Sequence, residues 1–327
     1  MKFLTIFKRN LIVFSIYILL VTIAIVFYGL IIRLPLTKSI AHFLDLIRQV
    51  APLSLISIGQ TLVMLVGGID LSLGAIASLA NILSANFMKG EASLIPISVF
   101  LTLIICILIG FISGVVIVKV KMPPFLVTLA MSSVIRGAYL LYTGGAPRGG
   151  IAEGFRSIAR EWIGSPIGNA PGIFPVAGII WITIFFVLLF AINKTNFGVE
   201  LYAVGGNPRT AWLSGFNPNK FTIGIYMLSA TLAGMSGLMH SALIGGALLH
   251  VGDPYLLDSI AATCIGGTTF DGGVGGIVGT IAGVLIIQLL NAFMTIMGIK
   301  ETGKYIALGL LIIAILSINH LIASSRR

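Results

Sequence analysis

The chain has 327 residues, of which 57% are hydrophobic and 9% are charged, and its mean hydropathy is +1.10. Repeated apolar runs near the ~20 residues needed to cross a bilayer exclude a soluble fold, and their continuity excludes a membrane β-barrel, whose strands alternate. The formal net charge of +10 comes from dispersed basic residues without a basic-aromatic patch. We therefore attribute the charge to membrane topology and expect no nucleic-acid partner.

Apolar periodicity and glycine or proline breaks predict an all-α, polytopic membrane bundle of about ten helices. The eighth predicted span is about half the length needed to cross, so we expect a broken helix that ends at Gly266-Gly267. We treat residues 1–327 as one transmembrane domain with both termini in the cytoplasm. The predicted spans are residues 11–32, 50–66, 70–88, 94–118, 124–143, 173–193, 221–244, 257–270, 275–297 and 303–321.

Two segments between the spans are polar. Residues 193–220 lie on the side of the termini, and within them Asn207 can cap a helix that starts at Pro208. Gly215 is placed to end that helix, so we predict a short helix from Pro208 to Ser214. This helix is either presented to another protein or part of an ordinary loop.

The outer segment 144–172 is rich in glycine and proline and carries charged side chains. It either docks a soluble partner or connects two spans.

Two glycine-rich stretches, residues 67–74 and 266–276, each place one carboxylate beside a membrane span. Each is followed by a helix rich in small residues, which raises the hypothesis of a distant internal repeat. We expect Asp70 and Asp271 to cap backbone N–H groups at the helix starts.

Polar side chains inside the spans are candidates for a translocation pathway. Arg136 must face protein, water or a partner charge, so we expect it to be buried among helices, in a pore or in an ion pair. Gln288 and Asn291 suit a sugar-sized pathway, although hydrogen bonds between helices would explain them as well. The full set of pathway candidates is Gln60, Asp70, Ser72, Arg136, Gln288 and Asn291.

Several motifs are absent from the sequence. No G-x-x-x-x-G-K-[ST] stretch occurs, so we expect no ATP hydrolysis by this chain. No nucleophile-base constellation is visible, and neither the histidines nor the cysteines have metal-ligand spacing. Cys106 and Cys264 are expected to be buried packing residues. Nothing in the sequence therefore supports an intramembrane enzyme, and we expect no enzymatic activity and no cofactor.

Four blocks of sequence, in this order, resemble the permease subunits of bacterial ribose-type sugar importers of the ATP-binding cassette class. They are GQTLVMLVGGIDLSLGAIASLA at 59–80, KMPPFLVTLAMSSVIRGAYLLYTGG at 121–145, KTNFGVELYAVGGNPRTAWLSGFNPNK at 194–220 and LLDSIAATCIGGTTFDGGVGGIVGTIAGVL at 256–285.

The resemblance implies a dimer of permease chains, identical or different, in the lipid of the bacterial inner membrane. It also implies cytoplasmic ATP-binding subunits and a periplasmic sugar-binding protein as partners. Segment 193–220 then becomes a cytoplasmic coupling loop, and 144–172 becomes a periplasmic loop. The residues that the resemblance assigns to coupling are Gly205, Gly206, Asn207, Arg209, Leu213, Ser214 and Gly215.

Departures from the family pattern at Pro208, Trp212 and Asp271 leave the particular sugar and the particular ATPase open. Two alternatives stay in view: a permease of the related importers for branched-chain amino acids or nucleosides, and an ion-coupled secondary transporter. The secondary transporter would need membrane carboxylates, for which Asp70, Asp258 and Asp271 are available.

Overall fold

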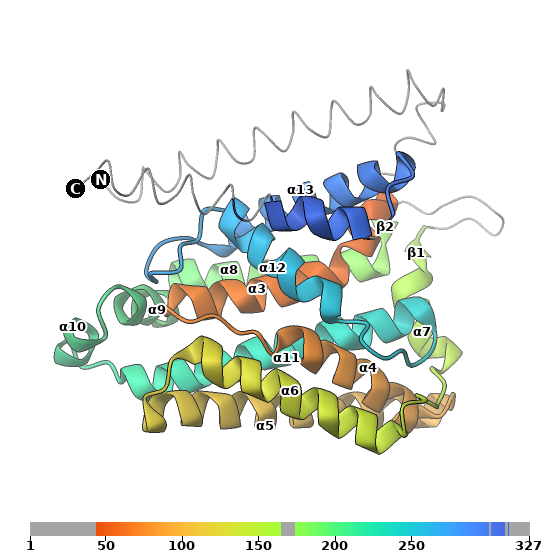
Figure 1. Ribbon diagram of the computed structural model, residues 1–327, viewed down its shortest axis with the longest axis horizontal. Coiled ribbons are helices and arrows are strands. Elements are labelled where there is room, and N and C mark those ends of the chain that lie inside the picture. The colour runs from red at the N-terminus through yellow and green to blue at the C-terminus, as the bar shows by residue number, and fades with distance from the viewer. Residues whose placement is uncertain (1–43, 165–173, 301, 311–312, 314–327) are drawn as a thin grey trace.

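The computed structural model describes residues 44–164, 174–300, 302–310 and 313, which form a bundle of helices lying side by side (Figure 1). The predicted span 11–32 and the end of the span 303–321 lie outside the described residues. The helices are α3 (Ala51–Leu65), α4 (Leu73–Met88), η1 (Ala92–Leu94), α5 (Ile95–Val120), α6 (Pro124–Thr143), α7 (Glu153–Arg160), α8 (Val176–Lys194), α9 (Asn196–Gly206), α10 (Pro208–Leu213), α11 (Pro218–Ile244), α12 (Asp253–Ile265) and α13 (Ile277–Ile296). Residues 302–310 are also helical.

Local sequence explains where these helices begin and end. Six of them, α3, α5, α6, α10, α11 and α12, carry proline at the first or second position, where a missing N–H costs nothing. Gly144 and Gly245 follow α6 and α11 in the left-handed region, which ends a helix at little steric cost in glycine. As predicted, α12 is short and is followed by Gly266-Gly267.

Among the described residues, five helices are long and apolar enough to cross a membrane: those at 92–120, 124–143, 176–194, 218–244 and 277–296. The helices α3 and α4 are shorter and apolar. The all-α membrane architecture is thus confirmed, whereas the total of ten spans and the internal repeat stay predictions.

The helix α3 lies at the centre of the bundle, and all 15 of its residues are buried. It packs against α11, α12 and α13. In contrast, α5, α6 and α8 expose large apolar side chains such as Phe100, Leu141 and Phe190, as expected of helices that face lipid. Cys106 and Cys264 are both buried, which confirms their packing role.

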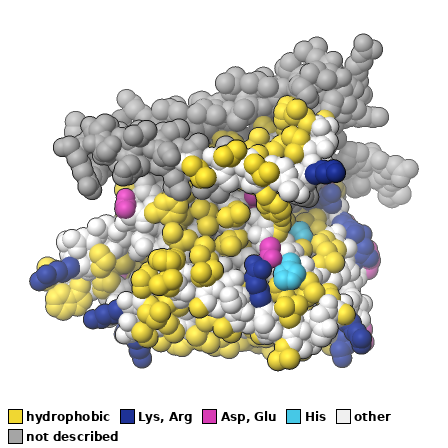
Figure 2. All heavy atoms as spheres, viewed as in Figure 1, with side chains coloured by type: hydrophobic (Ala, Val, Ile, Leu, Met, Phe, Trp, Pro, Cys, Tyr) yellow, Lys and Arg dark blue, Asp and Glu magenta, His cyan; other side chains and the backbone are white. Residues whose placement is uncertain are grey.

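The bundle has two ends, which we call the α10 end and the α7 end after the short helices that mark them (Figure 1). At the α7 end, β1 (Trp162–Ile163) and β2 (Phe174–Pro175) pair antiparallel, with Trp162 opposite Pro175. Hydrophobic side chains cover much of the face between the ends, and basic side chains gather toward the ends (Figure 2).

The sequence predicted one short helix in the polar segment 193–220, whereas most of this segment is helical in the structure. The predicted helix is α10, which ends at Leu213, and Ser214 is its C-cap. The preceding helix α9 was missed. Its signals are Thr195, whose side chain accepts a hydrogen bond from the Phe197 N–H at 3.2 Å, and the helical spacing of the apolar residues Phe197, Leu201 and Val204.

Candidate functional site: an exposed short helix and a polar pocket

The short helix α10 extends from one end of the bundle (Figure 1). Asn207 caps it as predicted, because its Oδ1 accepts hydrogen bonds from the N–H groups of Arg209 at 3.0 Å and Thr210 at 3.1 Å. Trp212 is 65% exposed and Leu213 is 71% exposed. This helix therefore presents adjacent apolar side chains outside the body of the bundle, which is the surface that a protein partner would bury.

The end of α9 contacts both glycine-rich stretches. A β-carbon at Gly205 would collide with the carbonyl oxygen of Leu65 and would lie 2.7 Å from the Gly273 nitrogen. Gly273 itself donates a backbone hydrogen bond to the Leu65 carbonyl oxygen at 2.8 Å. We call the meeting of residues 65–68, 205–206 and 271–273 the glycine junction. It joins α9 directly to the turns that follow α3 and α12.

Those two turns have the same backbone form. Gly67 and Gly267 both have φ +81°, and the N–H groups of the following residues, Gly68 and Thr268, donate to carbonyls five residues earlier, at 3.0 and 3.1 Å. This hydrogen-bond pattern is a common way to end a helix. This turn geometry accounts for Gly67 and Gly267, so their presence does not require an internal repeat.

The two carboxylates near these turns differ. Asp70 is buried, and its Oδ1 accepts hydrogen bonds from the Ser72 N–H at 2.9 Å and the Ser72 Oγ–H at 2.5 Å. Asp70 thus orders the residue before α4. The prediction that Asp271 caps a helix is wrong, because Asp271 is exposed and the N-cap of α13 is Gly276. Four residues of the turn separate Asp271 from that cap, so its carboxylate lies too far before α13 to accept hydrogen bonds from the first N–H groups of the helix.

The interior around α3 contains further polar groups. Thr61 of α3 contacts Thr280 of α13 at 2.6 Å and Thr263 of α12 at 3.3 Å through hydroxyl hydrogen bonds. Gln60 is fully buried, and its amide has no hydrogen-bond partner among the described residues. The pathway candidates Gln60, Asp70 and Ser72 therefore lie in the bundle interior, apart from Gln288 and Asn291.

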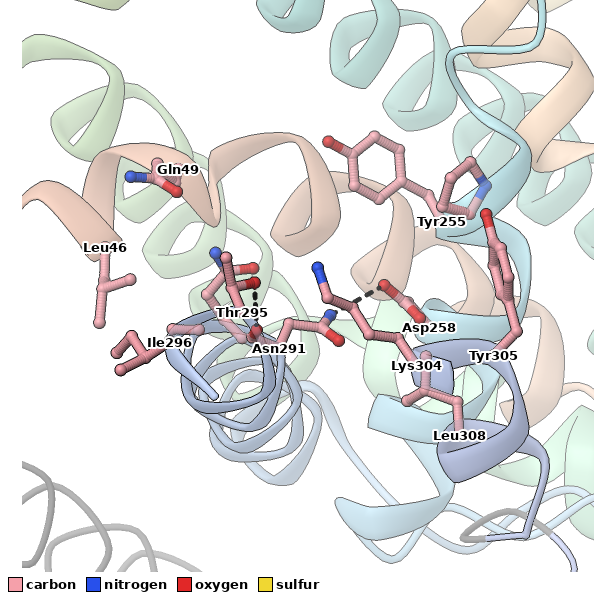
Figure 3. A pocket seen from close by; sticks show the side chains of 13 residues that line it. Leu46, Gln49, Tyr255, Asp258, Asn291, Thr295, Ile296, Lys304, Tyr305 and Leu308 are labelled. Carbon is pink, nitrogen blue, oxygen red and sulfur yellow. Dashed lines mark hydrogen bonds between the residues drawn. The ribbon is translucent and has the colours of Figure 1, made fainter. Parts of the chain in front are cut away.

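Gln288 and Asn291 line a pocket of about 380 Å³ between α12, α13 and the helical segments at 44–49 and 302–310. Asp258, Asn291 and Lys304 converge on its middle, and Tyr255 and Tyr305 lie to one side (Figure 3). Asn291 Nδ2 donates to Asp258 Oδ2 at 3.5 Å. The pocket is lined by Leu46, Gln49, Pro254, Tyr255, Asp258, Gln288, Asn291, Ala292, Thr295, Ile296, Lys304, Tyr305 and Leu308.

Sequence reasoning missed Tyr255, Lys304 and Tyr305, and it considered Asp258 only as a carboxylate for ion coupling. The available signal was the spacing of Tyr255 and Asp258, three residues apart on one face of a helix. Nothing local in the sequence indicates that the segment at 302–310 closes the same pocket.

Arg136 has the ionic partner that a membrane arginine requires. Its Nη2 lies 2.9 Å from Asp253 Oδ1 at the start of α12, and His250 Nδ1 lies 3.2 Å from Asp253 Oδ2. Tyr139 shares a hydrogen bond of 2.9 Å with His250. On one largely hydrophobic face, basic, acidic and histidine side chains lie against one another (Figure 2).

The expected ion pair between helices is confirmed, whereas the expected burial of Arg136 is met only in part, since its side chain is 36% exposed. The helix α6 lies at the side of the bundle, so α12 can supply the carboxylate without enclosing the guanidinium. Arg136 does not line the pocket that contains Asn291.

These features define a polytopic helical membrane protein with a polar pocket between its helices. The model of one protein family, described as "Branched-chain amino acid transport system / permease component", matches residues 42–316. The chain belongs to this family of transport permeases.

Two curated relatives are named as import permeases, in agreement with the family assignment. The ribose import permease protein of Bacillus subtilis (strain 168) is 36% identical over 274 residues, which cover 83% of this chain and 82% of the relative. The galactose/methyl galactoside import permease protein of Haemophilus influenzae is 32% identical over 331 residues, covering 96% and 94%. The resemblance to ribose-type sugar import permeases is confirmed. No solved structure matches the chain.

Proposed function

We propose that this chain is the transmembrane permease subunit of an ATP-binding cassette importer, and that it translocates a ribose-like monosaccharide delivered by a periplasmic binding protein. Relatives named as ribose and galactose import permeases support the sugar. The observation that carries the proposal is the geometry of the α10 end. There a capped, exposed helix is connected through Gly205 to the turns after α3 and α12.

In this proposal α10 is the coupling helix and binds a groove of a cytoplasmic ATP-binding subunit. The chain has no phosphate-binding loop of its own, so the energy comes from ATP hydrolysis on separate subunits. When those subunits close, α10 moves, and α9 transmits the displacement to the glycine junction. Backbone contact at the junction leaves little room for compression, so the turns and the helices attached to them must move with α9.

The remaining assignments follow from that orientation. Residues 1–327 form one domain in the bacterial inner membrane and pair with a second permease chain. The loop 193–220 and both termini are cytoplasmic, and 144–172 is a periplasmic loop that meets the sugar-binding protein. The pathway then runs from the α7 end toward the α10 end, past Gln288 and Asn291 and the interior groups Gln60, Asp70 and Ser72.

The test is reconstitution in proteoliposomes with the cognate ATP-binding and sugar-binding proteins, without an ion gradient. ATP-dependent import of D-ribose or D-galactose is the expected result. Gly206→Pro and deletion of Asn207–Gly215 should each abolish import while the chain still inserts and dimerises. Normal import by these variants would disprove the coupling assignment. Import driven only by an ion gradient would identify a secondary transporter, and import of L-leucine alone would identify an amino-acid importer.

A further inference from the structure

We propose that the pocket between α12, α13 and the segment at 302–310 is a low-affinity resting site for one neutral monosaccharide during transport, with Asp258 and Asn291 as its main hydroxyl-binding residues. This inference rests on the proposed function and adds to it a defined site. The pocket volume of about 380 Å³ is within the range of small-molecule sites.

The polar groups of the pocket match the hydroxyls of a sugar. Asp258 is 6% exposed, and its bond from Asn291 is 3.5 Å long, at the weak end of the hydrogen-bond range. A carboxylate has about four acceptor sites, so Asp258 can accept from sugar hydroxyls in addition to its partners within the chain, which include Asn291. The amide of Asn291 both donates and accepts, as a hydroxyl requires of its partner.

Tyr255 and Tyr305 both line the pocket on one side (Figure 3), so an aromatic ring is available to stack against the C–H face of a sugar ring. Tyr255 is held in place by His240 of α11. The Tyr255 hydroxyl and His240 Nδ1 are 3.1 Å apart, and the two rings meet edge to face with centroids 5.5 Å apart. His240 is therefore a positioning residue that orients Tyr255 from outside the pocket.

The charges of the pocket favour a neutral ligand. The formal charges of Asp258 and Lys304 cancel, so the lining does not select a phosphorylated sugar. Gln49 Nε2 donates to Asp45 Oδ2 and Thr295 Oγ1 donates to the Asn291 carbonyl oxygen, both at 2.7 Å. The remaining acceptor oxygens of these two side chains and the amide of Gln288 can still hydrogen-bond to the hydroxyls of a polyol.

The pocket lies far from the coupling apparatus. Asn291 is 14 residues beyond Ile277, the first residue of α13, which corresponds to about 21 Å along the helix axis. A ligand there would sit in the half of the bundle nearer the α7 end, before the glycine junction on the proposed route. A few weak hydrogen bonds would hold it with a Kd of about 1–10 mM, which allows onward release.

The first experiment measures access to the pocket. In the assembled complex, Thr295→Cys is labelled with a maleimide in the presence of increasing D-ribose, D-galactose or L-leucine. The native cysteines are buried. The matched control is Phe293→Cys on the same helix, which is 39% exposed and does not line the pocket. We expect at least one sugar to slow labelling of Thr295→Cys about twofold when its concentration equals Kd, with no effect at position 293.

The second experiment separates the pocket from coupling. Asn291→Leu and Asp258→Asn should lower sugar import roughly tenfold, the loss expected when a buried polar partner is left unpaired. Stimulation of ATP hydrolysis by the loaded binding protein should stay near the wild-type value. Phe293→Leu is the control and should import normally.

The outcomes distinguish the two proposals. If the wild-type complex imports no sugar, the proposed function fails. If the wild type imports a sugar but Asn291→Leu and Asp258→Asn import it equally well, or if sugars do not protect Thr295→Cys, the resting site is disproved. Protection by L-leucine and not by sugars would also overturn it.

Discussion

The backbone N–H of Gly273 donates a hydrogen bond to the carbonyl oxygen of Leu65 at 2.8 Å, which ties the turn after α12 to the end of α3. Gly205 packs against both partners of this bond, with no room for a β-carbon. Three segments that are far apart in the sequence are thus joined through backbone atoms. Such a contact transmits displacement better than one made by flexible side chains.

Gly205→Ala should destabilise the protein by about 1–3 kcal/mol, because the new methyl group meets the fixed carbonyl oxygen of Leu65. Gly206→Ala is the matched control, since a β-carbon there meets nothing within 4 Å. Both changes gain the same helix propensity, so the difference between their thermal unfolding midpoints isolates the collision. Equal midpoints would mean that the glycine junction is not tightly packed.

Trp212→Ala and Leu213→Ala should each weaken binding of the ATP-binding subunit by about 2 kcal/mol, as expected for exposed apolar anchors that a partner buries. Stability of the isolated chain should change by less than about 0.5 kcal/mol. Val199→Ala, which removes an exposed apolar side chain from α9, is the control and should bind normally. Co-purification and titration of the ATP-binding subunit measure the effect. Unchanged binding by both α10 variants would remove this surface from the interface.

The pair of Arg136 and Asp253 should contribute a coupling energy of about 0.5–1 kcal/mol, because both side chains are about one third exposed and solvent screens them. A double-mutant cycle with Arg136→Leu and Asp253→Asn, followed by thermal unfolding in one detergent, measures it. The control is a second cycle that combines Asp253→Asn with Val134→Ala, at an exposed position on the same helix as Arg136. The effects in this control cycle should be additive. Additive effects in the first cycle would argue that the ion pair has no stabilising role.

The purified chain alone should hydrolyse no ATP and bind pentoses and hexoses only weakly. A route that releases its cargo must hold it loosely, and each hydrogen bond to a hydroxyl contributes only about 0.5–1.5 kcal/mol. Calorimetry of the isolated chain against D-ribose and D-galactose is the measurement. Micromolar or tighter binding would contradict a conduit and favour a secondary transporter.

Features that depend on neighbouring residues could be predicted from the sequence alone. Apolar runs, prolines at helix starts and glycines at helix ends located most helices within a few residues, because these signals act within one turn of the chain. The cap at Asn207 and the half-length α12 were predicted for the same reason. The four blocks of resemblance led to the family that the comparisons confirm.

Which of these elements meet depends instead on the packing of the whole chain. Arg136 needed a carboxylate, but the choice of Asp253 depends on where the bundle places α6 relative to the first residue of α12. Gln288 and Asn291 were chosen as polar residues in a membrane span, yet their pocket requires Asp258 from α12 and Lys304 from beyond α13. The glycine junction likewise depends on contacts between backbone atoms of three distant segments. No periodicity or motif records such contacts, because they arise from the packing of whole helices and not from the local preferences of the residues that make them.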